Sequence, residues 1–293
     1  MLVTLVLAAG GVIAGLLGAL LGLGGGILIV PLLTLGFGLP IREAVGVSLV
    51  CVIVTSSAAA GVYLQERIAN LRLGMVLELF SAAGALVGGL AAFLLPDSLL
   101  AALFSALLLY TALAMLRRSP ARGGAAEVEA AAVDESLARP PEADTGARRG
   151  DGATLAAPRL VDALSGRGYH VHGLPVGVAG SLVAGLASAL LGIGAGIVKV
   201  PLMHLAMGVP LRVATATSNL MIGVTAAASA VIYLLRGGID PLLAGPTAVG
   251  VFIGASVGSR SAGRVDVRLV RALFVIVLLY TAVQMARRAL GMA

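Results

Sequence analysis

Apolar residues fill long runs of this chain, and short polar or Gly/Pro-containing stretches separate the runs. The runs lie at about 2–22, 27–38, 43–64, 75–95, 98–116, 173–192, 196–208, 213–235, 241–259 and 268–286. A helix needs roughly 20 apolar residues to cross a bilayer, and most of the runs reach that length. Only helices and closed barrels span lipid, because every backbone polar group must find its partner within the protein. The pattern predicts an all-α polytopic membrane protein with about 8–10 membrane segments.

The chain matches itself without gaps at a shift of 170 residues. Over positions 14–48, 19 of 35 residues are identical to those of 184–218, and the glycine-rich stretches and following prolines coincide. An apolar composition raises the number of chance identities, but it does not explain identity at more than half of the positions. The sequence therefore predicts two homologous transmembrane repeats, 1–118 and 173–293.

The stretch between the repeats, 119–172, has a different composition. It is rich in Ala, Gly and Pro, shows no apolar period and carries 6 Arg and 8 acidic residues. Such a segment cannot bury enough apolar surface to offset its conformational entropy. We predict a disordered polar linker here, and a regulatory arm is the alternative.

In each repeat, one apolar run is too short to form a straight span. The runs 27–38 and 196–208 follow glycine-rich stretches and contain Pro31 and Pro201. A helix broken by glycine and proline frees backbone groups, which protein or water must then satisfy. Short, interrupted segments at matching places of two halves indicate the binding site of a transporter. We predict a Gly/Pro-broken short helix in each repeat, with the solute bound between the two.

Charges in the connections between runs favour an inverted arrangement of the two repeats. Residues 96–98 carry one acid and no base, whereas the matching stretch 260–271 contains four arginines. By the positive-inside rule, the first connection belongs outside the cell and the second inside. Matched loops on opposite sides require an odd number of crossings per repeat, which five segments, the short one included, provide. Arg287 and Arg288, at the end of the last run, fit this topology poorly.

Composition supports a membrane location and excludes other classes. Hydrophobic residues make up 59% of the chain and charged residues 12%, with mean hydropathy +1.05, whereas soluble domains carry about 25% charged residues. The net charge of +6 does not indicate a nucleic-acid partner, because the excess bases lie just beyond the apolar runs. The single cysteine, Cys51, is interpreted as a buried small side chain. We expect a multi-pass protein of the cell membrane, surrounded by the lipid bilayer.

Short motifs recur at matching places in the two repeats. They are glycine-rich stretches at 22–26 and 192–196, Val-Pro pairs ending at Pro31 and Pro201, serine-containing helix starts at 44–49 and 214–218, and the turn Gly237-Gly238-Ile239-Asp240. Over nearly everything except the linker, the chain resembles the TauE/SafE sulfite exporter (TSUP) family. The resemblance implies an integral membrane transporter for small sulfur-containing anions (sulfite, sulfonate or thiosulfate) or related organic anions. Ala195 and Asn219 depart from the family pattern, which leaves the substrate open.

Lys199 is the only lysine of the chain and lies inside an apolar segment, where the first repeat has Ile29. An ionisable group in such a segment is costly and is usually functional. A cation beside the start of a broken helix suits an anion, since the helix dipole and unpaired N–H groups also favour negative charge. The alternative is a lysine that extends from a short helix to the membrane interface.

Polar groups near the two glycine breaks complete the predicted anion site. Hydroxyl and amide groups at the start of the following long helix replace water around an oxyanion without adding fixed charge. The alternative for them is hydrogen bonding between helices. The predicted substrate-binding residues are Gly24, Gly25, Gly26, Ser48, Gly194, Ala195, Gly196, Lys199, Thr217, Ser218 and Asn219. Ser218 and Asn219 are the strongest candidates among the polar side chains.

Four further residues are candidates for proton transfer or for the path by which a solute enters. Glu78 lies about one turn into its predicted helix, where an interfacial carboxylate is the favoured interpretation. His204 lies on the second short helix, and a role in solute–proton coupling is the hypothesis for its side chain. Arg42 and Arg212 follow matching prolines in short connections, where topology or steering of anions is favoured over a central site.

Motifs of enzymes are not found in the sequence. The glycine-rich stretches match neither the dinucleotide fingerprint nor the phosphate loop, and no spacing of His, Cys and acids indicates a metal. We therefore expect no catalytic residues, cofactor or metal. The sequence predicts a secondary transporter that moves a small anionic solute by alternating access, with a proton or another ion as a candidate coupling partner. An anion channel that uses the same site is the alternative, and the oligomeric state is left open.

Overall fold

The computed structural model describes residues 2–20, 26–65, 69–117, 169–261 and 267–291. These ranges form ten α-helices: α1 (Leu2–Leu20), α2 (Gly26–Pro31), α3 (Ile41–Gln65), α4 (Leu71–Leu94), α5 (Asp97–Arg117), α8 (Leu174–Leu191), α9 (Gly196–Pro201), α10 (Leu211–Leu235), α11 (Pro241–Ser261) and α12 (Val267–Ala289). Two π-helical stretches, η1 (Leu32–Gly36) and η2 (Leu202–Ala206), directly continue α2 and α9. The prediction of an all-α protein is confirmed for the described part of the chain.

Six of these helices, α4, α5, α8, α10, α11 and α12, are long and apolar enough to cross a membrane. Shorter apolar helices cover Val3–Ala19, Gly26–Gly36 and Gly196–Ala206. Large apolar side chains of the long helices face outward, among them Leu79, Leu94 and Leu242, which are 70%, 85% and 81% exposed. Lipid accepts such a surface and water does not. The protein is a polytopic membrane protein, as the hydropathy pattern predicts.

Each of the two short helices changes from α-helical to π-helical geometry at a proline. Pro31 ends α2 and Pro201 ends α9, and a proline has no N–H group to donate into an α-helical turn. In η1, the Thr34 hydroxyl donates to the carbonyl oxygen of Val30 at 2.8 Å, which satisfies a backbone acceptor beside the irregular turn. A short helix broken at a proline therefore occurs in each half of the chain, as predicted, and the glycines at 22–25 before α2 fall outside the described residues.

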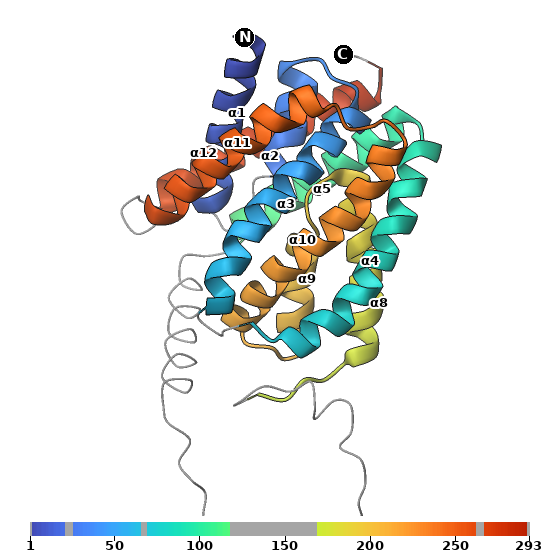
Figure 1. Cartoon of the computed structure of the whole chain (residues 1–293), viewed down its shortest axis with the longest axis vertical. Helices are drawn as coiled ribbons and strands as arrows, with labels where there is room; N and C mark the ends of the chain where they lie inside the picture. Colours follow the sequence, from blue (N-terminus) through green and yellow to red (C-terminus); the bar gives the residue numbers. More distant parts are fainter. Residues whose placement is uncertain (1, 21–25, 66–68, 118–168, 262–266, 292–293) are drawn as a thin grey trace, which may run out of the picture.

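The two halves of the chain exchange helices. α1 packs along α11, and α4 packs along α8, so each pair joins a helix of the first half to one of the second (Figure 1). Equivalent backbone contacts occur in both pairs, 170 residues apart. A Cβ atom on Gly185 would lie 2.0 Å from the Ser81 carbonyl oxygen, and one on Gly15 would lie 2.3 Å from that of Val251. Glycine permits these close approaches, which are common in membrane helix packing.

The helices α3 and α10 pack against each other in the middle of the molecule, and α5 pairs with α12 (Figure 1). The hydroxyl of Ser56 on α3 donates to the carbonyl oxygen of Asn219 on α10 at 2.5 Å. The broken helix α2 packs on α3, and its counterpart α9 packs on α10. The central pair α3–α10 therefore holds both broken helices in place.

Only the last residues of the predicted linker, 169–172, lie in the described part of the chain. Val171 is 2% exposed and belongs to an apolar cluster that also contains Met203 and Met207. The backbone N–H of His172 donates to the carbonyl oxygen of Met207 at 3.1 Å. This short segment is therefore part of the packed fold, and the rest of the predicted linker falls outside the described residues.

Candidate functional site

The two glycine breaks lie against the same side chain of α3, Val52. A Cβ atom on Gly26, the first residue of α2, would lie 2.5 Å from one Val52 methyl group, and one on Gly194 would lie 2.9 Å from the other. One turn earlier, the Ser48 hydroxyl donates to the carbonyl oxygens of Gly26 and Gly192 at 3.1 and 2.7 Å. A single serine therefore ties the start of α2 to the break before α9. Predicted site residues from both halves meet here.

The start of α9 combines unusual backbone geometry with a buried hydroxyl group. Gly194 and Ala195 have φ angles of 77° and 53°, and a residue with a side chain incurs roughly 1–2 kcal/mol in this region. The hydroxyl of Ser218 on α10 is buried and makes no hydrogen bond in the structure as described. A Cβ atom on Gly196 would lie 3.8 Å from this oxygen. An oxyanion beside α9 would accept the hydrogen bond that Ser218 is able to donate.

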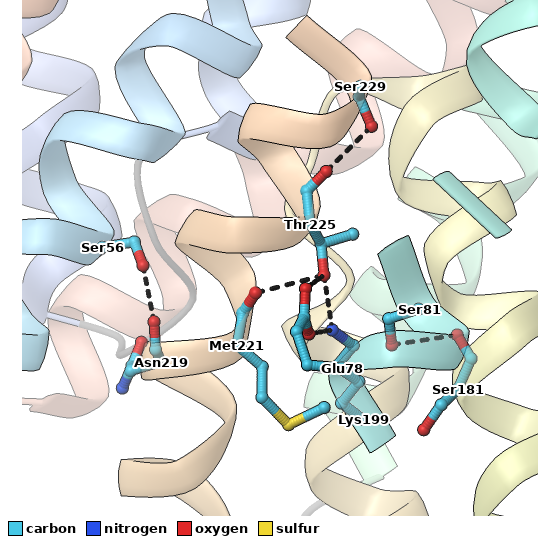
Figure 2. Close-up of polar contacts among 9 residues, drawn as sticks. All are labelled: Ser56, Glu78, Ser81, Ser181, Lys199, Asn219, Met221, Thr225 and Ser229. Carbon is cyan, nitrogen blue, oxygen red and sulfur yellow. Dashed lines mark hydrogen bonds and ion pairs between the residues drawn. The ribbon is translucent and has the colours of Figure 1, made fainter. Parts of the chain in front are cut away.

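Figure 2 shows a buried polar cluster built from three elements: Lys199 of α9, Glu78 of α4 and Thr225 of α10. Lys199 Nζ lies 2.9 Å from Glu78 Oε2 and 2.7 Å from Thr225 Oγ1. Thr225 Oγ1 in turn donates to Glu78 Oε1 at 2.7 Å. Lys199 is 1% exposed and Glu78 is 8% exposed. The lysine therefore ends in an interior ion pair and does not extend to the protein surface.

The position of Glu78 corrects the interpretation as an interfacial carboxylate. The hydropathy pattern starts this helix at about residue 75, whereas α4 begins at Leu71 behind the N-cap Asn70, whose side chain accepts from the Leu73 N–H at 3.1 Å. Glu78 consequently lies about two turns into the helix, on its buried side. Packing of α4 against α10 is what places the carboxylate beside Lys199.

The hydroxyl of Thr217, one of the predicted substrate-binding residues, supports the start of α4. Thr217 Oγ1 accepts from the Asn70 backbone N–H at 2.9 Å, and Asn70 Nδ2 donates to the Tyr169 hydroxyl at 2.8 Å. Burial raises the pKa of Tyr169, although the hydrogen bond from Asn70 lowers it, so this phenol stays neutral near neutral pH. Thr217 thus contacts backbone and not the cluster around Lys199.

Asn219 also lies away from the ion pair. Its carbonyl oxygen accepts from Ser56, and its side chain points away from Lys199 and Glu78 (Figure 2). Ser218 and Thr225 are seven residues apart on α10 and therefore share one face of that helix. Of the two strongest polar candidates, Ser218 and not Asn219 shares a face of α10 with the ion-pair cluster.

The remaining candidates are spread over other parts of the fold. Arg42 donates to the carbonyl oxygens of Ala92 and Leu95 at the end of α4 and lies 3.2 Å from Asp97 at the start of α5. Arg42 thus links the end of α4 to the start of α5, a structural role that the sequence did not suggest. His204 Nδ1 lies 3.0 Å from a backbone carbonyl oxygen in the turn after η2. Arg212 is half-buried in the first turn of α10.

The structure thus gathers part of the predicted site. Gly26, Ser48 and Gly194 meet at α3, while Ser218 lies beside Gly196. Gly24 and Gly25 fall outside the described residues. The pairing of Lys199 with Glu78 was not predicted, although charges within membrane segments usually pair, a rule that could have joined them. Thr225 was missed entirely, because a threonine in an apolar helix has no distinguishing pattern.

The match to known families agrees with this architecture. The family model described as "Sulfite exporter TauE/SafE" matches residues 7–285, nearly the whole chain. The chain belongs to the TauE/SafE family. The expected resemblance is thereby confirmed, and so is the prediction of a multi-pass membrane transporter and not an enzyme.

Two curated relatives have similar lengths. The "Probable membrane transporter protein YunE" of Bacillus subtilis (strain 168) is 24% identical over 283 residues, which cover 94% of each chain. The "Probable membrane transporter protein YdhB" of the same strain is 27% identical over 261 residues, which cover 89% of each chain. No solved structure matches this TauE/SafE protein. Family membership implies a small solute as the transported partner.

Proposed function

We propose that this TauE/SafE protein is a secondary transporter for small sulfur-containing or related organic anions, which it moves across the cytoplasmic membrane by alternating access. The observation that carries the proposal is Lys199, the one lysine of the chain, which lies 1% exposed on a broken helix. The family description, a sulfite exporter, supports a sulfur oxyanion such as sulfite, a sulfonate or thiosulfate.

The proposed anion seat lies between the start of α9 and the facing side of α10. The helix Gly196–Ala206 presents the positive end of its dipole there. Ser218 supplies a hydroxyl donor. Lys199 lies three residues after the start of the helix, and its ammonium group reaches Thr225 on α10. A hydroxyl and an ammonium group recognise an oxyanion in general and do not select one sulfur anion by themselves.

Alternating access is proposed as movement of rigid helix pairs against the centre. The pairs α1–α11 and α4–α8 pack through close backbone contacts at glycines, which favours motion of each pair as one unit. The central pair α3–α10 holds both broken helices. Motion of α4–α8 relative to α10 therefore changes the surroundings of Lys199, because its partner Glu78 is on α4.

Transport is tested with purified protein in liposomes. We expect counterflow of labelled sulfite, thiosulfate or methanesulfonate. Lys199→Met should lower this flux about 10- to 100-fold, because a hydrogen bond to a charged group contributes about 1.5–3 kcal/mol. The matched control is Arg287→Met, which removes an exposed cation and should transport like the unmodified protein.

The outcomes separate the candidate functions. Conductance without counterflow would identify an anion channel at the same site. Full flux in the Lys199→Met variant would remove this lysine from the site. Absence of flux for every sulfur anion in the unmodified protein would reject the proposed substrate class.

A further inference from the structure

We propose that Glu78 takes up a proton when the anion binds at Lys199, so that the protein moves protons together with its anion. This inference rests on the anion transport proposed above and names the coupling ion. Its basis is the geometry of the cluster in Figure 2. Each oxygen of the Glu78 carboxylate accepts a separate hydrogen bond, from Lys199 at 2.9 Å and from Thr225 at 2.7 Å. The carboxylate is therefore already paired with the ammonium group to which an anion would bind.

The equivalent place in the other half of the chain holds no charges. At a shift of 170 residues, Ile29 corresponds to Lys199 and Ala248 corresponds to Glu78. Ile29 and Ala248 are buried, at 0% and 7% exposure. Packing of the fold therefore does not require an ion pair there, and a buried ion pair is often no more stabilising than apolar residues of similar volume. The charges at this one place point to a role in binding or coupling.

Charge balance links the anion to the proton. With Glu78 ionised, the Lys199–Glu78 pair is neutral, and an added anion would leave a net negative charge in the interior. With Glu78 protonated and no anion, the ammonium group would be left unpaired. The favoured states are therefore the empty ion pair and the state that holds both the anion and the proton.

The coupled step is a proton transfer and an exchange of ion pairs. A proton from water adds to a carboxylate oxygen of Glu78, the ion pair with Lys199 breaks, and the anion pairs with the freed ammonium group. One proton and one unit of negative charge enter together. When the anion leaves, Glu78 returns its proton to water and the ion pair re-forms.

Thr225 keeps the cluster hydrogen-bonded in both states. Its hydroxyl has one hydrogen and two acceptors within reach: Glu78 Oε1 at 2.7 Å and the Met221 carbonyl oxygen at 3.1 Å. When Glu78 is ionised, the hydrogen points to the carboxylate. When Glu78 is protonated, the hydrogen turns to Met221, and the carboxyl O–H donates to the threonine oxygen. Among the described residues, the corresponding threonine of the first half, Thr55, bonds backbone carbonyl oxygens, those of Cys51 and Val52.

The charges near Glu78 are few. Helix α8 carries no ionisable side chain along its described length. Arg42 and Arg236 lie at the far end of α4, beside Ala92 and Phe93. The other ionisable groups on α4, on the helix α10 packed along it and on the segments around Lys199 are Arg72, Tyr169, His170, His172, Lys199, His204, Arg212 and Tyr233. The Tyr233 hydroxyl and the His204 ring each bond a backbone carbonyl. Lys199 makes the ion pair with Glu78, so these two residues set the charge balance at the site.

The test measures proton uptake on anion binding. Calorimetry with methanesulfonate and with ethanesulfonate, monovalent anions whose charge is constant near neutral pH, is carried out in buffers of different ionisation heat. The unmodified protein should take up one proton per bound anion, and its Kd should rise about tenfold per unit increase in pH. In Glu78→Gln, which carries a permanently neutral side chain, both the proton uptake and the pH dependence of Kd should vanish.

A matched variant and a spectroscopic measurement complete the test. Glu43→Gln removes a carboxylate in the first turn of α3, remote in sequence from the cluster, and should keep the proton uptake. Infrared difference spectra should show a protonated carboxyl band when the anion binds to the unmodified protein, a readout that does not depend on any variant folding.

Each result decides between the two proposals. Anion binding without proton uptake and without the carboxyl band would overturn the coupling and leave anion transport standing. No binding of either anion by the unmodified protein would overturn the proposed function and the coupling with it. Proton uptake that persists in Glu78→Gln would assign the coupling to another group and reject the role of Glu78.

Discussion

At the scale of single residues, the Lys199–Glu78 pair carries a large desolvation penalty. Removing two charges from water carries a penalty of several kcal/mol for each, which their attraction at 2.9 Å and the hydrogen bonds of Thr225 offset. The compensation depends on both partners being present. A lone Lys199 would keep its desolvation penalty without the attraction that balances it.

This balance predicts a non-additive response to substitution. Glu78→Ala should lower the free energy of unfolding by about 3–5 kcal/mol, because it leaves Lys199 buried and unpaired. Adding Lys199→Ile, which copies the residue at the matching position of the first half, should recover most of the loss. Thermal unfolding of the detergent-solubilised variants measures both effects. A double variant that is no more stable than Glu78→Ala would show that the charges are not the reason for the loss.

At the scale of helices, arginine side chains donate hydrogen bonds to backbone carbonyl oxygens at helix ends. Arg42 does so at the end of α4, and Arg288 of α12 donates to the carbonyl oxygens of Thr34 and Leu39 at 2.9 and 3.2 Å, at the end of η1. A π-helical turn leaves such carbonyl groups without partners in the helix. The contact gives Arg288 a structural task, and its charge is therefore a poor indicator of the membrane side on which it lies.

The glycine contacts between α4 and α8 predict a position-dependent effect of one methyl group. In Gly185→Ala the new Cβ atom would lie 2.0 Å from a backbone oxygen, so the two helices must separate, at a cost of about 1–3 kcal/mol or more. Gly180→Ala, on the same helix, meets only the flexible end of the Leu202 side chain and should change stability little. Thermal unfolding of both variants checks this, and equal losses would contradict the proposed backbone contact.

At the scale of the whole molecule, the exchange of helices makes each half depend on the other. The first half supplies α4, with Glu78, to the site whose lysine comes from the second half. The second half supplies α11 to pack along α1. The glycine-containing helix faces that make these contacts are buried only against helices of the other half. We therefore expect the two halves of the chain to fold as one unit.

The predicted inversion of the repeats is a property of the whole molecule and is open to a labelling test. In a Cys51→Ala background, Ser98→Cys and Asp266→Cys place one thiol in each of the two matched connections. A membrane-impermeant maleimide added to intact cells should label Ser98→Cys, whereas labelling of Asp266→Cys should require opened cells. Labelling of both from the same side would reject the inverted arrangement.

The helical elements were largely predictable, because lipid imposes the same rule on every span. The apolar runs 241–259 and 173–192 predicted the bounds of α11 and α8 to within a few residues, since a spanning helix must be apolar along its length. The start of α4 was misplaced by about four residues, because Asn70 caps the helix before its apolar run begins. That small error separated Glu78 from the site in the prediction.

The candidate site was predictable where a residue type was unusual in its surroundings. Lys199 stood out as a lone cation in an apolar helix, and the glycine breaks stood out by composition and by recurrence. Thr217 and Asn219 were selected for their polar side chains, yet the Thr217 hydroxyl accepts from the Asn70 backbone N–H, and Asn219 contacts Ser56 through its own backbone carbonyl oxygen. Polarity in a membrane helix does not by itself distinguish a ligand from a packing partner.

The sequence by itself determined the class of this protein, the rough extent of the helices in the described part of the chain, the repeat at 170 residues and the lysine at the second break. These follow from local rules, since hydropathy and glycine content act within one segment. Only the tertiary structure decided that α4 crosses to the other half and carries Glu78 to Lys199. The reason is that the two residues are 121 positions apart, and the close glycine contacts that bring them together exist only between folded helices.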